Sequence, residues 1–262
     1  GGNKREPAYD VTAEELSRRA EEAVARGATE LCLQGGIHPD YTGQTYLDIL
    51  NTVKAAAPEA HVHAFSPLEV HQGARALGIS TREFLHELKK NGLGSMPGTA
   101  AEILHDDVRK ILCPDKLSTR QWVDIVEEAH SAGIRTTATI MFGHVDRYAH
   151  WAAHLIELRE LQRRTRGITE FVPLPFVARE APIYRRGQAR MGPTAREAVL
   201  MHAIPRLVLA GLVDNIQASW VKLGTDGVAT CLEAGANDLG GTLMNESITR
   251  AAGASHGEEL PP

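Results

Sequence analysis

The polar residues of this sequence that could do chemistry gather where short apolar segments end. Gly35 and Gly36 follow such a segment, and two adjacent glycines let backbone N–H groups approach a bound anion or amino acid. Asn237 and Asp238 place an amide and a carboxylate just before Gly240-Gly241-Thr242, which could cradle a carboxylate or a phosphate. An ordinary chain turn is the alternative interpretation of both glycine pairs.

Two histidines, His61 and His63, flank a single valine in another apolar segment. Amidohydrolase barrels hold Zn²⁺ with such a pair, together with a His and an Asp on later strands, here His144 and Asp238. That arrangement belongs on the first strand of a barrel and needs a further strand-end His, where this sequence has Glu170. The other interpretation is that His63 hydrogen bonds to a ligand or to a neighbouring residue.

Two single charged residues are weaker candidates. Glu102 follows Gly98-Thr99 at a predicted helix start, where its carboxylate could bind a ligand or only complement the helix N-terminus. Lys222 lies near the end of the strand predicted at 215–221, where it could pair with an anion or face solvent.

The elements that must position these residues alternate between helix and strand. Thr12 and Glu15 form a capping box, which predicts a helix before any strand. Regular alternation predicts a parallel sheet with helices outside it. Seven strands behind a leading helix predict a (β/α) TIM-like barrel that lacks its first strand, with its chemistry at the carboxyl ends of the strands. The predicted strands are 29–34, 61–65, 93–95, 134–141, 168–172, 215–221 and 236–239; the predicted helices are 13–26, 46–57, 81–91, 102–112, 118–132, 147–164, 194–210, 228–234 and 245–252.

Composition limits the class of protein. The formal charge is −5 from 28 basic and 33 acidic residues, without a basic run, which argues against a nucleic-acid partner. No apolar stretch approaches about 18 residues, and the start of the chain has no apolar signal segment, so we expect a cytoplasmic protein with no membrane association. Cys32, Cys113 and Cys231 are too far apart for a metal motif and fit a reducing compartment.

We expect one domain over 1–254 and a frayed tail at 255–262.

Six ordered strings, spread over about 12–256, resemble one enzyme family. QGGIHP (34–39), HVHAFSP (61–67) and MPGTAAE (96–102) resemble the radical S-adenosylmethionine (SAM) enzymes of cofactor and menaquinone biosynthesis. TEFVPLPF (169–176), SWVKLG (219–224) and GANDLGGTLM (235–244) resemble, within that group, the second subunit of FO synthase.

The resemblance implies an activity and its cofactors. In that family a [4Fe-4S] cluster reductively cleaves SAM, and the resulting radical attacks L-tyrosine. The 4-hydroxybenzyl group is transferred to 5-amino-6-(D-ribitylamino)uracil in the biosynthesis of the deazaflavin FO, the precursor of coenzyme F-420. The first FO synthase subunit, or a fused N-terminal half, is the implied protein partner.

The resemblance also assigns residues. Those matched to SAM are Gln34, Gly35 and Gly36, with Ser66 and Glu102 as further contacts. Those expected to bind tyrosine and the pyrimidine, because they project polar groups from strand ends, are His63, His144, Gln217, Lys222, Asn237 and Asp238. The catalytic base is left unassigned.

The sequence departs from the family at the cluster. Family members use a Cys-x3-Cys-x2-Cys loop after the first strand, and the three cysteines here cannot replace it at their spacings. The loop and the first strand are missing together, so we expect an N-terminally truncated chain with the motif upstream of Gly1, inactive alone. The alternatives are a menaquinone-pathway cyclase like dehypoxanthine futalosine cyclase, a zinc hydrolase and a non-catalytic binding barrel.

Overall fold

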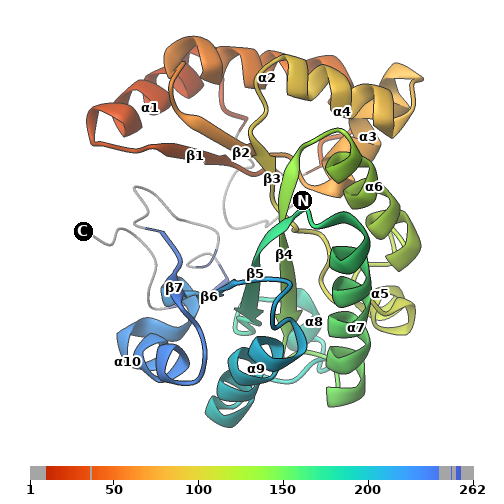
Figure 1. Cartoon of the computed structure of the whole chain (residues 1–262), viewed down its shortest axis with the longest axis vertical. Helices are drawn as coiled ribbons and strands as arrows, with labels where there is room; N and C mark the ends of the chain where they lie inside the picture. Colours follow the sequence, from red (N-terminus) through yellow and green to blue (C-terminus); the bar gives the residue numbers. More distant parts are fainter. Residues whose placement is uncertain (1–9, 36, 242–248, 250–251, 255–262) are drawn as a thin grey trace. The chain divides into compact units, whose positions relative to one another are not determined.

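A computed structural model describes residues 10–35, 37–241, 249 and 252–254, and Figure 1 shows its mixed α/β fold. The described residues fall into two compact units. Unit 1 comprises 10–97 and Asp124–Thr136, and unit 2 comprises Gly98–Val123 and the described residues from Thr137 onward. Gly36, the tail at 255–262 and all but two residues of the helix predicted at 245–252 lie outside the described residues.

Unit 1 is built from parallel strands that neighbour one another in chain order. Glu30 pairs with His61, His63 with Ser95, and Ser95 with Arg135, which starts the next strand. The elements are α1 (Ala13–Ala25), β1 (Glu30–Leu33), α2 (Gly43–Ala56), β2 (His61–Ala64), α3 (Pro67–Leu77), α4 (Thr81–Lys90), β3 (Ser95–Met96) and the first two residues of β4 (Arg135–Phe142).

The two faces of β2 have opposite character. Val62 and Ala64 are fully buried, whereas His61 is exposed and His63 is half-buried. Successive side chains of a strand point to opposite faces, so both histidines lie on the same face of the sheet. Helices cover the other face, and α2 buries Leu50 on that side. The sheet therefore presents its polar residues on the face that unit 1 leaves without helices.

Unit 2 continues the same pattern. Its strands again neighbour one another in chain order, and Gln217 pairs with Asp238 in a parallel register. α6 (Thr119–Ser131) and β4 are divided between the two units. The other elements are α5 (Asp106–Leu112), α7 (Tyr148–Thr165), β5 (Ile168–Pro175), α8 (Pro182–Arg185), α9 (Ala195–Val208), β6 (Asn215–Ala218), α10 (Trp220–Glu233) and β7 (Asp238–Leu239).

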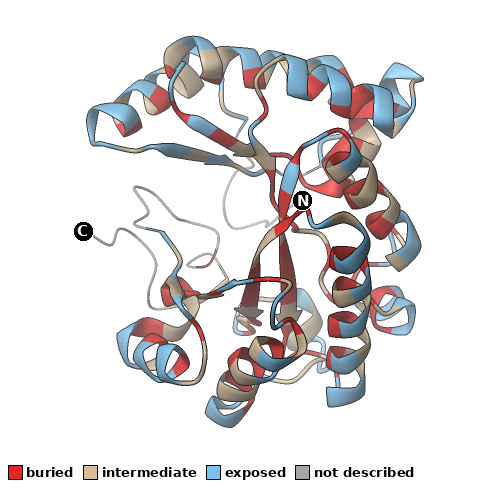
Figure 2. Ribbon diagram, in the orientation of Figure 1, coloured by how far each residue is buried: buried red, intermediate tan, exposed pale blue. Residues whose placement is uncertain are grey.

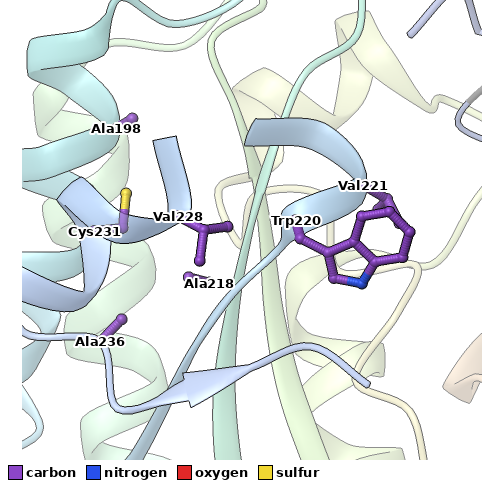
Figure 3. Packing of buried hydrophobic residues seen from close by; sticks show 7 residues of the cluster. All are labelled: Ala198, Ala218, Trp220, Val221, Val228, Cys231 and Ala236. Carbon is purple, nitrogen blue, oxygen red and sulfur yellow. The ribbon is translucent and has the colours of Figure 1, made fainter. Parts of the chain in front are cut away.

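The helices of unit 2 bury one side each. In α7, Trp151, Leu155 and Leu158 are buried at helical spacing, and Figure 2 shows exposed residues on the opposite side. An apolar cluster joins α9, α10, the end of β6 and the segment before β7 (Figure 3). Its buried members are Ala198, Ala218, Trp220, Val221, Val228, Cys231 and Ala236.

The predicted strand count and parallel arrangement are confirmed by the seven strands of the described chain. The helix predicted from 102 is wrong at its start, because α5 begins only at Asp106. Ala100 and Glu102 have positive φ angles of 59° and 46°, which an α-helix cannot contain. The Arg109 guanidinium donates to the carbonyls of Ala100, Ala101 and Leu117 and holds this loop in place.

The strand predicted at 215–221 is also too long. β6 ends at Ala218, and α10 begins at Trp220, because Trp220 and Val221 enter the apolar cluster as helix residues. Lys222 thus lies in the first turn of a helix instead of near a strand end. None of the helices in the described part of the chain combines the length and the apolar character that crossing a membrane requires.

Candidate active site

In unit 1, the buried Glu69 carboxylate joins two of the residues matched to SAM. Its Oε2 accepts hydrogen bonds from the Ser66 backbone N–H and from the Ser66 hydroxyl, both at 2.7 Å. Burial raises the pKa of Glu69, while hydrogen bonds from Ser66 and from the Gly35 backbone oppose that rise. Glu69 therefore fixes the backbone after β1 against the start of α3. Gln34 is exposed beside it, and Gly36 lies outside the described residues.

The Ser66 hydroxyl is both donor and acceptor in hydrogen bonds with Glu69. It donates to Glu69 and accepts the Glu69 backbone N–H at 3.3 Å, which completes the capping box of α3. The Ser-x-x-Glu spacing was visible in the sequence, but Glu69 was not among the predicted site residues. The contact of Ser66 with SAM stays a prediction.

Glu102 belongs to unit 2. Its Oε1 accepts a hydrogen bond from Lys116 Nζ at 2.6 Å, and its backbone carbonyl accepts the Met141 N–H at 2.8 Å. Glu102 thus anchors the loop before α5 to β4. Its assignment to SAM stays a prediction.

His63 shares a hydroxyl group with His61. The Ser95 Oγ lies 2.6 Å from His63 Nδ1 and 2.7 Å from His61 Nε2. Burial, and after it the neighbouring His61, lower the pKa of His63 to about 4, so His63 is neutral near pH 7. In the described part of the chain, no group of three or more His, Cys, Asp and Glu side chains is arranged to hold a metal ion. The geometry of the pair therefore favours hydrogen bonding over the zinc site considered from the sequence.

In unit 2, three polar side chains from three successive strands come together. Gln217 Nε2 donates to Glu170 Oε2 at 3.0 Å and reaches Asp238 Oδ2 at 3.5 Å. We call Glu170, Gln217 and Asp238 the carboxylate–amide cluster. A side chain at Gly240 would bring its Cβ within 2.4 Å of Gln217 Oε1, so glycine at this position leaves room for the amide.

Two of the predicted substrate residues, His144 and Asn237, hydrogen bond within the protein, and their contact with substrate stays a prediction. The His144 side chain is fully buried, with Nε2 at 2.8 Å from the Met141 carbonyl and Nδ1 accepting the Val145 N–H at 2.7 Å. Burial lowers the pKa of His144. Asn237 Oδ1 accepts the Ile216 N–H at 2.9 Å and an Arg206 N–H at 2.5 Å. Asn237 thereby ties β6 to the segment before β7.

Lys222 lines a cavity of about 340 Å³ in unit 2. Its Nζ donates to Thr249 Oγ1 at 3.1 Å. The walls of this cavity include Lys222 but neither Gln217 nor Asp238. The shared role of the three residues in binding substrate stays a prediction. The lining residues are Pro175, Phe176, Val177, Met191, Gly192, Pro193, Thr194, Ala195, Ala198, Val199, Lys222, Leu223, Gly227, Thr230 and Cys231.

The cysteines of this chain do not fit an iron–sulfur cluster. Such a cluster needs several thiolates that converge on its irons. Cys32 is exposed on β1 of unit 1, whereas Cys113, at the end of α5, and Cys231, in α10, are buried in unit 2. Burial raises the pKa values of Cys113 and Cys231, which disfavours the thiolate form that a metal requires.

Comparison with known proteins places this arrangement in a superfamily. The profile of the Radical SAM superfamily matches residues 2–157, which is more than half of the chain. A second profile, described as the CofH/MqnC C-terminal region, matches residues 165–259. The protein is a member of the radical SAM superfamily.

Individual relatives show which family within the superfamily the chain belongs to. The chain is 54% identical over 255 residues to the 5-amino-6-(D-ribitylamino)uracil–L-tyrosine 4-hydroxyphenyl transferase of Methanopyrus kandleri, covering 97% of this chain and 69% of that protein. It is 51% identical over 253 residues to the transferase of the same name from Methanocaldococcus jannaschii, covering 95% and 70%. The chain therefore belongs to the family of these 4-hydroxyphenyl transferases, as its sequence strings predicted.

Two longer proteins also match. The chain is 53% identical over 250 residues to the FO synthase of Streptomyces coelicolor, covering 95% of this chain but only 29% of that protein. Among solved structures, methylornithine synthase (PylB) superposes with a TM-score of 0.68 at 16% identity, covering 89% of this chain and 63% of that one. At this identity the likeness confirms the predicted fold class and nothing more.

Proposed function

We propose that this chain supplies the substrate-binding part of a radical SAM enzyme that transfers the 4-hydroxybenzyl group of L-tyrosine to 5-amino-6-(D-ribitylamino)uracil. The observation that carries the proposal is the 54% identity with a transferase of that name over 97% of the chain. The alternative cyclase has weaker support, because the relatives reported above are named as transferases or FO synthases.

The superfamily implies SAM and a [4Fe-4S] cluster as cofactors, and SAM supplies the radical when both are bound. Because the cysteines of this chain do not fit the cluster, the proposal for its residues is limited to binding and orientation. The Glu69 carboxylate accepts hydrogen bonds from the backbones of Gly35 and of Ser66, and it thereby holds the end of β1 beside the start of α3. The Glu69 carboxylate that these hydrogen bonds orient suits the ammonium group of an amino-acid moiety, and we assign this corner to SAM.

The carboxylate–amide cluster suits a substrate rich in N–H and O–H donors. Glu170 and Asp238 are both half-buried, and the Gln217 amide between them fixes their orientation. Carboxylates are acceptors only, when ionised, and hydrogen bonds to them are stronger than those between neutral groups. We assign the amino group and the ribityl hydroxyls of the pyrimidine to this cluster.

Calorimetric titration of the pyrimidine into the purified chain tests the assignment of the substrate. We expect saturable binding that an excess of a futalosine derivative does not displace. Competition by the futalosine derivative would support the cyclase instead, and a flat titration in folded protein would contradict the proposed site. Folding is checked on the same sample by circular dichroism.

A further inference from the structure

The Ser95 hydroxyl lies between two imidazole rings, and a hydroxyl has only one proton. Ser95 Oγ is 2.6 Å from His63 Nδ1 and 2.7 Å from His61 Nε2. It can therefore donate to one ring only and must accept from the other. As a result, the position of the proton on His61 determines its position on His63.

The protein makes room for this arrangement. A Cβ at Gly94 would lie 2.4 Å from Cε1 and 2.6 Å from Nδ1 of the His61 ring, closer than atoms can approach. The backbone at this position is fixed, because the Gly94 N–H donates to the Val62 carbonyl at 3.0 Å. Ser95 is also the register partner of His63, so β2 and β3 hold the serine and the second ring side by side.

The two rings differ in their surroundings. His63 is half-buried, and its pKa is lowered to about 4 by burial. Within the described part of the chain, its Nε2 makes no hydrogen bond. The His61 side chain is 44% exposed, and its Nε2 is 3.9 Å from Glu30 Oε2.

Other ionisable groups face the pair from the neighbouring strands. Cys32 of β1 is the register partner of His63, and Arg135 of β4 is the register partner of Ser95; both are exposed. A proton that leaves the half-buried His63 ring can pass to the more exposed His61 ring, which lies beside a carboxylate and can exchange with solvent.

We propose that His63, Ser95 and His61 form a proton relay that carries one proton from Nε2 of His63 to solvent. In the starting state, His63 Nδ1–H donates to Ser95 Oγ, and Ser95 O–H donates to His61 Nε2. When Nε2 of His63 takes a proton, its Nδ1 proton passes to Ser95 while the Ser95 proton passes to His61. His61 is then the imidazolium and releases its Nδ1 proton to water.

One proton enters and one leaves, and no other bond changes. The relay rests on the proposed function only for the identity of the group that donates the proton, since the sequence left the base that deprotonates tyrosine unassigned. Ser95 is a positioning residue in this scheme, and His63 is the group that meets the substrate.

Nitrogen-detected NMR of the ligand-free chain, labelled with ¹⁵N-histidine, tests the relay by reporting which ring nitrogens carry protons. Whenever the His61 ring carries two protons, we expect the single proton of neutral His63 to lie on Nε2, and otherwise on Nδ1. Ser95→Thr keeps a hydroxyl and should keep this coupled shift. Ser95→Ala should abolish it.

Two controls keep the test decisive. Gly94→Ala retains Ser95 but displaces the His61 ring, so it should also abolish the coupling, whereas Ser131→Ala on α6 should not. The relay is overturned if the His63 tautomer in the unmodified chain does not change with the protonation of His61. It is also overturned if the coupled shift persists in Ser95→Ala. Because no substrate is present, failure of the proposed function would leave this result unchanged.

Discussion

Gln217 illustrates how one side chain can organise two charged neighbours. Its amide donates toward Glu170 and Asp238 from the strand between theirs, and Gly240 leaves the space in which it does so. Without the amide, two half-buried carboxylates would face each other with one less donor between them. The position of Gln217 should therefore control how well the cluster binds a donor-rich ligand.

Replacing Gln217 with leucine should weaken binding of the pyrimidine while leaving the fold intact. Hydrogen bonds to charged groups contribute about 1.5–3 kcal/mol, so we expect the dissociation constant to rise by roughly ten- to hundredfold. Calorimetric titration measures this change. The exposed Gln188→Leu in the same unit is the matched control and should bind as the unmodified chain does. Equal affinities in the two variants would remove the pyrimidine from the carboxylate–amide cluster.

At the residue scale, the sequence predicted the residues that follow strands and missed those that act through tertiary contacts. Gln217 and Asp238 were predicted because polar residues at strand ends face the same edge, and the structure brings them together. Ser95 and Glu69 were not assigned roles. Ser95 contacts two histidines that lie more than 30 residues away in the sequence, so no short sequence pattern reveals the contact. Glu69 alone had a signal, its capping-box spacing to Ser66.

The loop before α5 shows how an element boundary depends on close backbone packing. A Cβ at Gly98 would lie 2.3 Å from the Thr137 carbonyl oxygen and 2.6 Å from Ala138 Cα. Gly98 also accepts the Thr139 hydroxyl at 2.6 Å, so the loop lies directly on β4. Backbone atoms cannot move aside as a flexible side chain can.

Gly98→Ala should accordingly destabilise unit 2. Overpacking in a well-packed region costs about 1–3 kcal/mol of unfolding free energy, and we expect a loss of that size. Urea denaturation followed by circular dichroism measures it. Gly241→Ala is the control, because a Cβ there meets nothing within 4 Å, and it should change the unfolding free energy little. Similar stabilities for both variants would contradict the close approach.

Elements were best predicted where the signal is local. The predicted N-cap at Thr12 places the start of α1 correctly, since the Glu15 N–H donates to the Thr12 hydroxyl. The Glu15 carboxylate bonds to Arg18 and Arg19, so of the predicted capping box the structure shows the Thr12 half. The helix predicted from 102 was wrong because the contacts that override it come from Arg109 and β4. α3 was not predicted as a separate helix, although its own capping box starts it.

At the scale of the whole molecule, stability should depend on pH through buried histidines. Burial lowers the pKa of His63 and His130 to about 4 and that of His154 to about 3, below the ordinary value of 6.5. The unfolded chain then binds more protons than the folded chain between these values. The stabilisation is complete above pH 6.5 and is lost as the pH falls toward 4.

Urea denaturation at a series of pH values from 7 to 4 checks this expectation. Each histidine that stays neutral only in the folded state contributes a slope of up to about 1.4 kcal/mol per pH unit. His154→Gln should reduce the slope, because His154 is fully buried and its pKa is lowered furthest of the three. A stability that does not change over this range would show that these rings protonate freely in the folded protein.

The global prediction from the sequence has succeeded in part. The periodicity of apolar residues correctly predicted seven parallel strands, since strand and helix patterns depend on neighbouring residues. The expectation of one domain over 1–254 stays a prediction, because the assembly of two compact units depends on contacts that local patterns do not encode. Family membership came from ordered strings at the ends of strands, where the chemistry of such folds lies.

The most direct test of the central claim is turnover in a chimera. The 255 matched residues of the Methanopyrus kandleri transferase are replaced by this chain, and the protein is assayed without oxygen with SAM, a reductant, L-tyrosine and the pyrimidine. We expect a coupled 4-hydroxybenzyl product, detected by mass spectrometry, that requires both substrates. A chimera that binds iron and cleaves SAM but forms no such product, or that converts a futalosine derivative instead, would contradict the account.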